Sequence, residues 1–222
     1  MSVPRFRAES RMAASHDGDP LSICFDVSFR RCRESDLAAL EWHGLFTAHR
    51  RIIRMAFLRQ KRGRNLMLVA DANGLPIGQI WIDWTRSRRP STAMFWAFRV
   101  LPWFQGRGIG VKLLEFAEET VRRKKFRAVE LGVEKHNLRA ARLYERLGYK
   151  RVGELKEEFW SVQPDGRRIR HKLDEWLMRK QLEAPSVLGL PATDLPTPAK
   201  PALSDDEVPA PCPGVSILTD KL

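Results

Sequence analysis

The feature that most constrains this chain is a run of three glycines at alternate positions, Gly106, Gly108 and Gly110. It follows an apolar stretch typical of a strand, Met94 to Leu101, and precedes a segment in which apolar residues recur every four positions from Ile109 onward. Glycine lacks a Cβ atom, so the backbone of such a turn can adopt positive φ and approach a ligand closely. The first N–H groups of the following helix have no partner within the helix and attract anions. The sequence therefore predicts a phosphate-binding turn.

The charges around this turn favour the same interpretation. A helix usually carries Asp or Glu in its first turn, against its positive end. Here Arg107 and Lys112 flank the turn, and the first acid is Glu115. A bound anion would supply the missing negative charge.

Two better-known phosphate loops differ from this one in spacing. A Walker A loop needs the pattern GxxxxGK[ST], which is absent. A dinucleotide-binding loop needs GxGxxG, whereas this loop is GxGxG, although Glu134 follows the next strand where a ribose-binding acid would stand. A dinucleotide site and a turn that serves helix packing alone both stay open at this point.

The pattern along the 222 residues divides the chain into three parts. Residues 1–24 show no periodic apolar pattern and are predicted to be a flexible lead-in. Residues 25–183 have the alternating apolar patterns of one folded domain. Residues 184–222 hold eight of the 14 prolines, and such a density denies the backbone its hydrogen-bond donors, which predicts a disordered tail.

The folded part reads as a mixed α/β (α+β) domain. Ser35 is the expected N-cap of a first helix that runs through Leu40 and Leu45. Two hairpins are indicated by the turn residues around Asn73-Gly74 and Asp165-Gly166. We expect a mixed, mostly antiparallel sheet of about seven strands with helices on both faces. The expected strands are 25–33, 66–70, 76–84, 94–101, 128–133, 149–162 and 169–178, and the other helices are 49–64, 109 onward and 138–147.

Composition narrows the function classes. The formal net charge is +12, from 39 Lys and Arg against 27 Asp and Glu, so an RNA, ribosomal or phosphorylated partner suits the chain, as does a merely solvated basic face. The three cysteines form no CxxC pair and the five histidines have no metal-ligand spacing, so no metal is expected. No apolar run approaches the roughly 18 residues of a membrane span, and we expect a cytoplasmic protein.

Beyond the glycines, the segment resembles the GNAT superfamily of N-acetyltransferases over residues 25–178. Gln105-x-x-Gly108-x-Gly110 matches that family's Q/R-x-x-G-x-G/A pyrophosphate loop. Asn137, followed by Ala140-Ala141-x-x-Tyr144-x-x-x-Gly148-Tyr149, is similar to its N-x-x-A-x-x-L-Y-x-x-x-G-F/Y segment. Two motifs in the right order and at the right separation carry the resemblance.

The resemblance implies acetyl-CoA as co-substrate and a set of residue roles. Main-chain groups of Phe98 and Val100 would pair with the pantetheine arm, and Asn137 would hydrogen-bond to it. Tyr144 would protonate the departing thiolate, although its apolar neighbours also suit a core residue. The pyrophosphate loop would comprise Gln105, Gly106, Arg107, Gly108, Ile109, Gly110 and Val111.

The resemblance leaves the general base unassigned. Members that acetylate protein N-termini place a Glu five residues before the Asn, and here that position is Gly132. Asp83, Glu130 and Glu134 remain candidates, each of which also suits an ordinary surface charge. Strand alternation puts Glu130, Gly132 and Glu134 on one face.

Three functions follow from these observations. The first is an N-acetyltransferase that acts on a primary amine of a small molecule or protein by direct attack on acetyl-CoA. The alternatives are a non-catalytic GNAT-like domain that binds acetyl-CoA, and a basic module associated with RNA or the ribosome. The positive charge favours an acceptor on the ribosome, or an amine that carries a carboxylate or phosphate.

Overall fold

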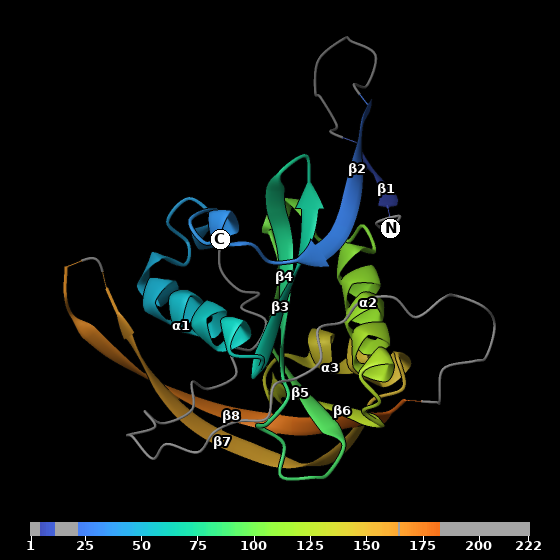
Figure 1. The fold of residues 1–222 in the computed structure, drawn as a ribbon, viewed down its shortest axis with the longest axis vertical. Helices are drawn as coiled ribbons and strands as arrows, with labels where there is room; N and C mark the ends of the chain where they lie inside the picture. The colour runs from blue at the N-terminus through green and yellow to red at the C-terminus, as the bar shows by residue number, and fades with distance from the viewer. Residues whose placement is uncertain (1–4, 12–21, 164, 183–222) are drawn as a thin grey trace.

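The computed structural model describes residues 5–11, 22–163 and 165–182. Eight strands in this part of the chain form one sheet in the order β1-β2-β3-β4-β5-β6-β8-β7 (Figure 1). Neighbouring strands are antiparallel except β5 and β6, which are parallel. The strands are β1 (Arg5–Arg11), β2 (Ser22–Arg31), β3 (Asn65–Ala72), β4 (Leu75–Asp83), β5 (Thr92–Val100), β6 (Ala128–Glu134), β7 (Lys150–Val162) and β8 (Arg168–Gln181).

Helices cover both faces of the sheet. On one face, α1 packs against β3 over a cluster that includes Trp81 and Trp96, and on the other α2 and α3 cover a larger core that includes Leu113 and Tyr144 (Figure 1). The predicted mixed sheet with helices on both faces is confirmed. The helices are α1 (Arg50–Lys61), α2 (Ile109–Arg123) and α3 (Leu138–Arg146), with 3₁₀ helices η1 (Glu34–Asp36), η2 (Ala39–Glu41), η3 (Thr47–His49) and η4 (Pro102–Phe104).

The sheet extends further toward the N-terminus than the sequence pattern indicates. Within residues 1–24, which we expected to be a flexible lead-in, β1 forms and pairs antiparallel with β2, and β2 begins at Ser22. A strand at a sheet edge needs a backbone partner and no periodic apolar pattern, which is why the pattern did not reveal it. The predicted tail, 184–222, lies outside the described residues.

The prediction of a helix that starts at Ser35 is wrong. The segment forms the short helices η1 and η2 instead. Asp36 accepts a hydrogen bond from the backbone N–H of Arg33 at 2.6 Å and pairs with Arg30, which fixes a tight turn there. Trp42 then takes φ 45°, a left-handed conformation that ends any helix.

Both hairpins that the turn residues predicted are present in the structure. Asn73 and Gly74 have φ of 52° and 88°, as a two-residue turn between β3 and β4 requires. Strands β7 and β8 form the second predicted hairpin and pair along almost their whole length. Its turn includes residue 164, which is not among those described.

The two parallel strands separate partway along their length. Strand β5 pairs with β6 from Thr92 to Phe95, opposite Ala128 to Leu131, and the described register ends there. On its other side, β5 has a bulge against β4, where Ala97 takes φ 50°. We call the place where residues 96–100 of β5 diverge from residues 132–134 of β6 the splay.

Candidate active site

Helix α2 begins at a turn that leaves its first amides without intrahelical partners. Gly106 and Gly108 both have φ of 75°, and Gly108 is the N-cap, with no side-chain cap and no acid in the first turn. The first hydrogen bond of the helix at this end runs from the N–H of Lys112 to the carbonyl of Gly108, at 3.0 Å. The N–H groups of Ile109 and Gly110 precede it and, as at any helix start, have no acceptor within the helix.

The glycines serve backbone conformation more than packing. A Cβ atom at Gly106 would meet no other atom within 4 Å, but its φ of +75° strains any other residue. At Gly110 a Cβ would lie 3.5 Å from atoms of Phe98 and Val100, an ordinary contact distance. The turn therefore does not need glycine for close helix packing, and the start of α2 lies directly against the end of β5 beyond the splay.

Two side chains of the turn bind its own backbone. Gln105 Nε2 donates to the carbonyl of Val100 at 2.9 Å. Arg107 Nη1 donates to the carbonyls of Trp103 and Gln105, at 2.5 and 3.2 Å. These bonds hold the turn against the end of β5, and they occupy one acceptor position on Val100, whose main chain we expected to pair with a pantetheine arm.

Asn137 lies at the start of α3 and acts as its N-cap. Its Oδ1 accepts a hydrogen bond from the N–H of Ala140 at 3.0 Å, and the residue is buried. The motif spacing that suggested a ligand contact thus also has a structural role, because an Asn N-cap satisfies one of the unpaired amides of a helix start.

Tyr144 lies on the buried face of α3, where its ring packs near Phe98 and Tyr149, with centroids 6.4 and 5.6 Å apart. Burial, and then the charge of Glu175, raise the pKa of Tyr144 well above its ordinary value. The hydroxyl therefore stays protonated at neutral pH.

The three carboxylates considered as bases all have partners in the structure. The Asp83 carboxylate is buried and also accepts from the N–H of Thr85. Such contacts give these acids structural roles. The pairs are Asp83 with Arg59 at 2.7 Å, Glu130 with Ser87 at 2.8 Å and Arg89 at 3.1 Å, and Glu134 with His136 at 2.9 Å.

Sequence reasoning missed two buried charged groups. Glu175 on β8 is 1% exposed and neither of its carboxylate oxygens has a hydrogen-bond partner. Burial, and then Glu157 and Glu134, raise the pKa of Glu175 to about 8, while Arg86 opposes the increase. Arg99 on β5 is 5% exposed, with no partner for Nε or Nη1.

Each of the two had a weak signal in the sequence. Arg99 interrupts an otherwise apolar strand, and Glu175 alternates with Leu173 and Leu177 on one face of β8. The opposite face of β8, with Trp176 and Met178, is also apolar, so alternation did not reveal which face was buried.

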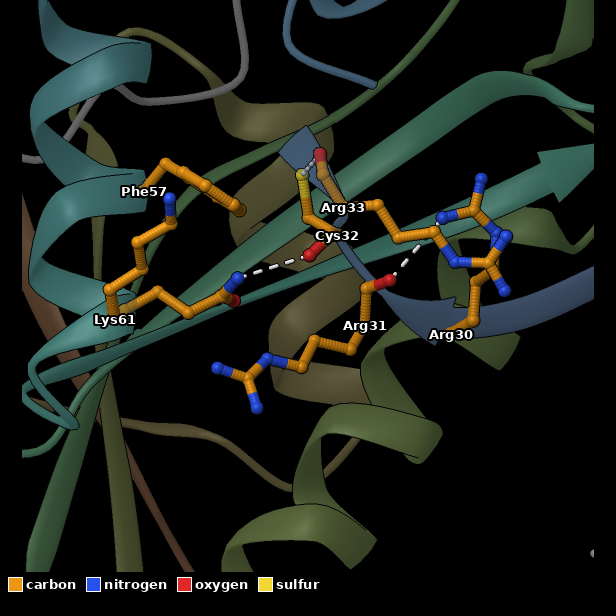
Figure 2. A pocket seen from close by; sticks show the side chains of 7 residues that line it. Arg30, Arg31, Cys32, Arg33, Phe57 and Lys61 are labelled. Atoms are coloured by element: carbon orange, nitrogen blue, oxygen red, sulfur yellow. Dashed lines mark hydrogen bonds between the residues drawn. The ribbon is translucent and has the colours of Figure 1, made fainter. Parts of the chain in front are cut away.

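A separate hollow of about 460 Å³ lies between the end of β2 and α1. Figure 2 shows Arg30 and Arg33 on one side of it, Phe57 and Lys61 on the other, and Cys32 between them. Two of its cations are paired, Arg30 with Asp36 and Asp71, and Lys61 with Glu34. Strands β3 and β4 separate β2 from β5, so the hollow lies apart from the start of α2.

The described part of the chain also bears on metal sites and membrane spans. Across 5–11, 22–163 and 165–182, no group of three or more His, Cys, Asp or Glu side chains is arranged to hold a metal ion. None of the helices in this part is both long and apolar enough to cross a membrane.

Comparisons with known proteins agree with the geometry. The family model described as the acetyltransferase (GNAT) family matches residues 30–149, more than half of the chain. An uncharacterized N-acetyltransferase from Methanocaldococcus jannaschii is 35% identical over 92 residues, which cover 40% of this chain and 41% of that relative. The chain thus aligns with about two fifths of the relative's length.

Solved structures share the fold at lower identity. The ribosomal-protein-alanine N-acetyltransferase from Brucella melitensis has a TM-score of 0.55 at 22% identity, covering 69% of this chain and 99% of that one. A putative acetyltransferase from Salmonella typhimurium, solved with its cofactor acetyl-CoA, has a TM-score of 0.54 at 22% identity, covering 73% and 98%. With the fold and the family match in agreement, the chain belongs to the GNAT acetyltransferase family.

Proposed function

We propose that this protein is an N-acetyltransferase that transfers the acetyl group of acetyl-CoA to a primary amine of a small molecule or protein by direct attack. The observation that carries the proposal is the start of α2, where amides without intrahelical partners and a first turn without acids lie against the splay. Family membership supports acetyl-CoA-dependent acyl transfer as the reaction class.

The cofactor contacts follow from the same elements. The amides from Gly106 to Val111 would hold the diphosphate, because a helix N-terminus favours negative charge. The edge of β5 from Phe98 to Val100 would offer main-chain groups to the pantetheine arm, since on the β6 side the described register ends at Phe95. Asn137 would contribute through its amide nitrogen, because its oxygen caps α3.

Acetyl-CoA supplies the acetyl group as a thioester, whose sulfur leaves with negative charge. Tyr144 would donate its hydroxyl proton to that sulfur. The raised pKa of Tyr144 keeps the hydroxyl protonated at neutral pH, so that it can donate a hydrogen bond to the departing sulfur. Burial of the hydroxyl in a low-dielectric site also strengthens its hydrogen bond to the developing charge.

We propose the chemical class of the acceptor from the net charge of the chain. The net charge of +12 disfavours a polycationic acceptor and favours a partner or acceptor that carries negative charge. The Brucella melitensis structure is named a ribosomal-protein-alanine N-acetyltransferase. A protein α-amine on the ribosome therefore belongs in any acceptor panel, beside small amines that bear a carboxylate or phosphate.

Calorimetry with Lys112→Glu tests the cofactor site. The variant puts an acid in the first turn of α2, and we expect the affinity for acetyl-CoA to fall about tenfold, because the new charge competes with the diphosphate for the helix end. Lys112 is exposed and pairs with Glu115 three residues on, so losing this pair has little effect on stability.

Lys125→Glu is the matched control, with the same charge change beyond the other end of the helix, about 22 Å away. It should bind acetyl-CoA as the unaltered chain does. No heat of binding with the unaltered chain would refute the proposed function. Equal affinities for both variants would show that the diphosphate does not lie at the start of α2.

A further inference from the structure

We propose that Glu175 is the general base that takes the proton from the attacking amine, an inference that rests on the proposed function. It deepens that function by naming a group that no motif indicates. The carboxyl group of Glu175 is buried, lacks hydrogen-bond partners and acts electrostatically on Tyr144.

The carboxyl group of Glu175 fills the space above Gly132. A Cβ atom at Gly132 would lie 2.2 Å from Oε2 of Glu175 and 2.8 Å from its Cδ, so any side chain there would collide with it. Gly132 has no positive φ, so room for Glu175, and not backbone conformation, accounts for the glycine. Where some family members place a Glu at the position of Gly132, this chain has a glycine, and the carboxyl group of Glu175 from β8 lies in that space.

This location is at the splay. Gly132 is the first residue of β6 after Leu131, the last that pairs with β5, and it pairs with Leu177 on β8. Tyr144 approaches from α3 on the other face of the sheet, and the charge of Glu175 contributes to its raised pKa. A proton acceptor and a proton donor therefore flank the point where the strands diverge.

The surroundings of Glu175 set it apart from the other acids. Neither oxygen has a hydrogen-bond partner, although buried carboxylates normally do. The charged groups that act on it are Glu157 of β7, Glu134 of β6 and Arg86 after β4, and together with burial they bring its pKa to about 8. Such a pKa suits a base that works near neutral pH.

The step balances within the proposed reaction. The amine nitrogen forms a bond to the thioester carbonyl carbon, and Glu175 takes the proton that this nitrogen sheds. The carbon–sulfur bond then breaks, and the sulfur takes the hydroxyl proton of Tyr144. Return of the proton from Glu175 to the Tyr144 oxygen through solvent restores both groups.

Glu175→Gln tests the assignment, because it keeps the shape and removes the basic oxygen. In a coenzyme-release assay over peptides with N-terminal alanine, amino acids and polyamines, we expect kcat to fall about 10²- to 10⁴-fold. Calorimetric affinity for acetyl-CoA should stay unchanged. Asp174→Asn is the matched control, because Asp174 is the adjacent acid on β8, is exposed and pairs with Lys135.

A relocated carboxylate gives a second test. Glu175→Ala vacates the space above Gly132, and Gly132→Glu added to it returns a carboxyl group to that space from β6. We expect Glu175→Ala to be as slow as Glu175→Gln, and the double variant to recover at least tenfold in kcat. A merely structural role for Glu175 would not produce this rescue.

The outcomes separate the two proposals. Full turnover by Glu175→Gln, or a double variant no faster than Glu175→Ala, overturns the base while the proposed function stands. An unaltered chain that binds acetyl-CoA but acetylates no acceptor of the panel overturns both. If Glu175 is the base, kcat of the unaltered chain should rise with pH up to about 8, measured with an acceptor whose amine pKa is near 10.4. This rise near pH 8 should be absent in Glu175→Gln.

A different observation points to the chemistry of the acceptor. We infer that Arg99 binds a carboxylate or phosphate group on the amine acceptor, which again rests on the proposed function. Arg99 lies on β5 beyond the bulge, with Nε and Nη1 unpartnered and its guanidinium 4.1 Å from the centroid of the Phe46 ring. A buried charge normally has a counter-ion, and none acts on Arg99.

The electrostatics around Arg99 are those of an anion site. Burial alone lowers its pKa to about 9, so the guanidinium stays charged at neutral pH. His49 beside it is neutral there, because burial, and then the charge of Arg99, lower the pKa of His49 to about 4. An oxyanion would satisfy both unpartnered nitrogens, since guanidinium matches carboxylate and phosphate in a two-point contact.

Paired acceptors test this inference. Alanine against alaninamide, and phosphoethanolamine against ethanolamine, differ in the oxyanion. We expect kcat/KM to favour one or both anionic members 10- to 100-fold, and Arg99→Met to abolish the preference through KM with kcat kept. Arg88→Met, which removes an exposed charge, should keep it. No preference in the unaltered chain, or a preference that survives Arg99→Met, overturns the inference.

Discussion

Replacing Tyr144 with phenylalanine is expected to lower kcat about 10²- to 10⁴-fold and to leave the affinity for acetyl-CoA unchanged. The variant removes one oxygen atom from a fully buried ring and keeps its packing near Phe98. The leaving sulfur then departs without a proton donor. Steady-state coenzyme release gives kcat, and calorimetry gives the affinity.

The matched control is Tyr149→Phe, because Tyr144 and Tyr149 are the two tyrosines of the chain. The Tyr149 hydroxyl donates to buried Glu118 at 2.9 Å, so this variant should lower the free energy of unfolding by about 1 to 3 kcal/mol and keep kcat. Equal kcat values for the two variants would contradict a donor role and leave Tyr144 as a core residue.

The free energy of unfolding is expected to fall as pH rises from about 4.5 to about 8, through Glu175. Its pKa moves from 4.5 in an exposed state to about 8 in the fold. Between these values the folded chain holds a proton that the unfolded chain releases, so raising the pH favours unfolding. At about 1.4 kcal/mol for each pKa unit, the loss amounts to up to about 5 kcal/mol.

Urea unfolding at pH 5 and pH 9 measures this effect against Glu175→Gln. At pH 5, where Glu175 is protonated, the unaltered chain and Glu175→Gln should have similar free energies of unfolding. At pH 9 the free energy of unfolding of Glu175→Gln should be higher by several kcal/mol. Taking the difference between them cancels the titration of all other groups. Parallel stability curves would show that Glu175 ionises without cost in the folded state.

Local sequence signals predicted most of the fold. The turn at Asn73-Gly74 and the four-residue spacing from Ile109 along α2 are patterns that neighbouring residues impose on each other, and the structure contains both elements. The helix expected after Ser35 failed because a tertiary contact, Arg30 with Asp36, overrides the local preference. Strand β1 was missed because edge pairing leaves little trace in side-chain pattern.

In the candidate site, too, local sequence patterns predicted some residues, and tertiary contacts determine the others. The glycine turn and the motif around Tyr144 are contiguous in sequence, so spacing alone placed them on α2 and α3. Glu175 lies 43 positions beyond Gly132, and their contact exists because β8 inserts between β6 and β7. The partners of Asp83, Glu130 and Glu134 are likewise set by tertiary packing.

The β-bulge at Ala97 decides which side of the sheet the side chains of the rest of β5 face. Trp96 and Ala97 both pack in the cluster beneath α1, and Phe98 then joins the core beneath α2 and α3. Because side chains alternate along a strand, a regular strand through Ala97 would turn Phe98 toward α1 and Arg99 into the opposite core, whereas the bulge absorbs the extra residue. The bulge thus keeps the Phe98 ring in the core beneath α2 and α3 and the Arg99 cation on the other side of the sheet.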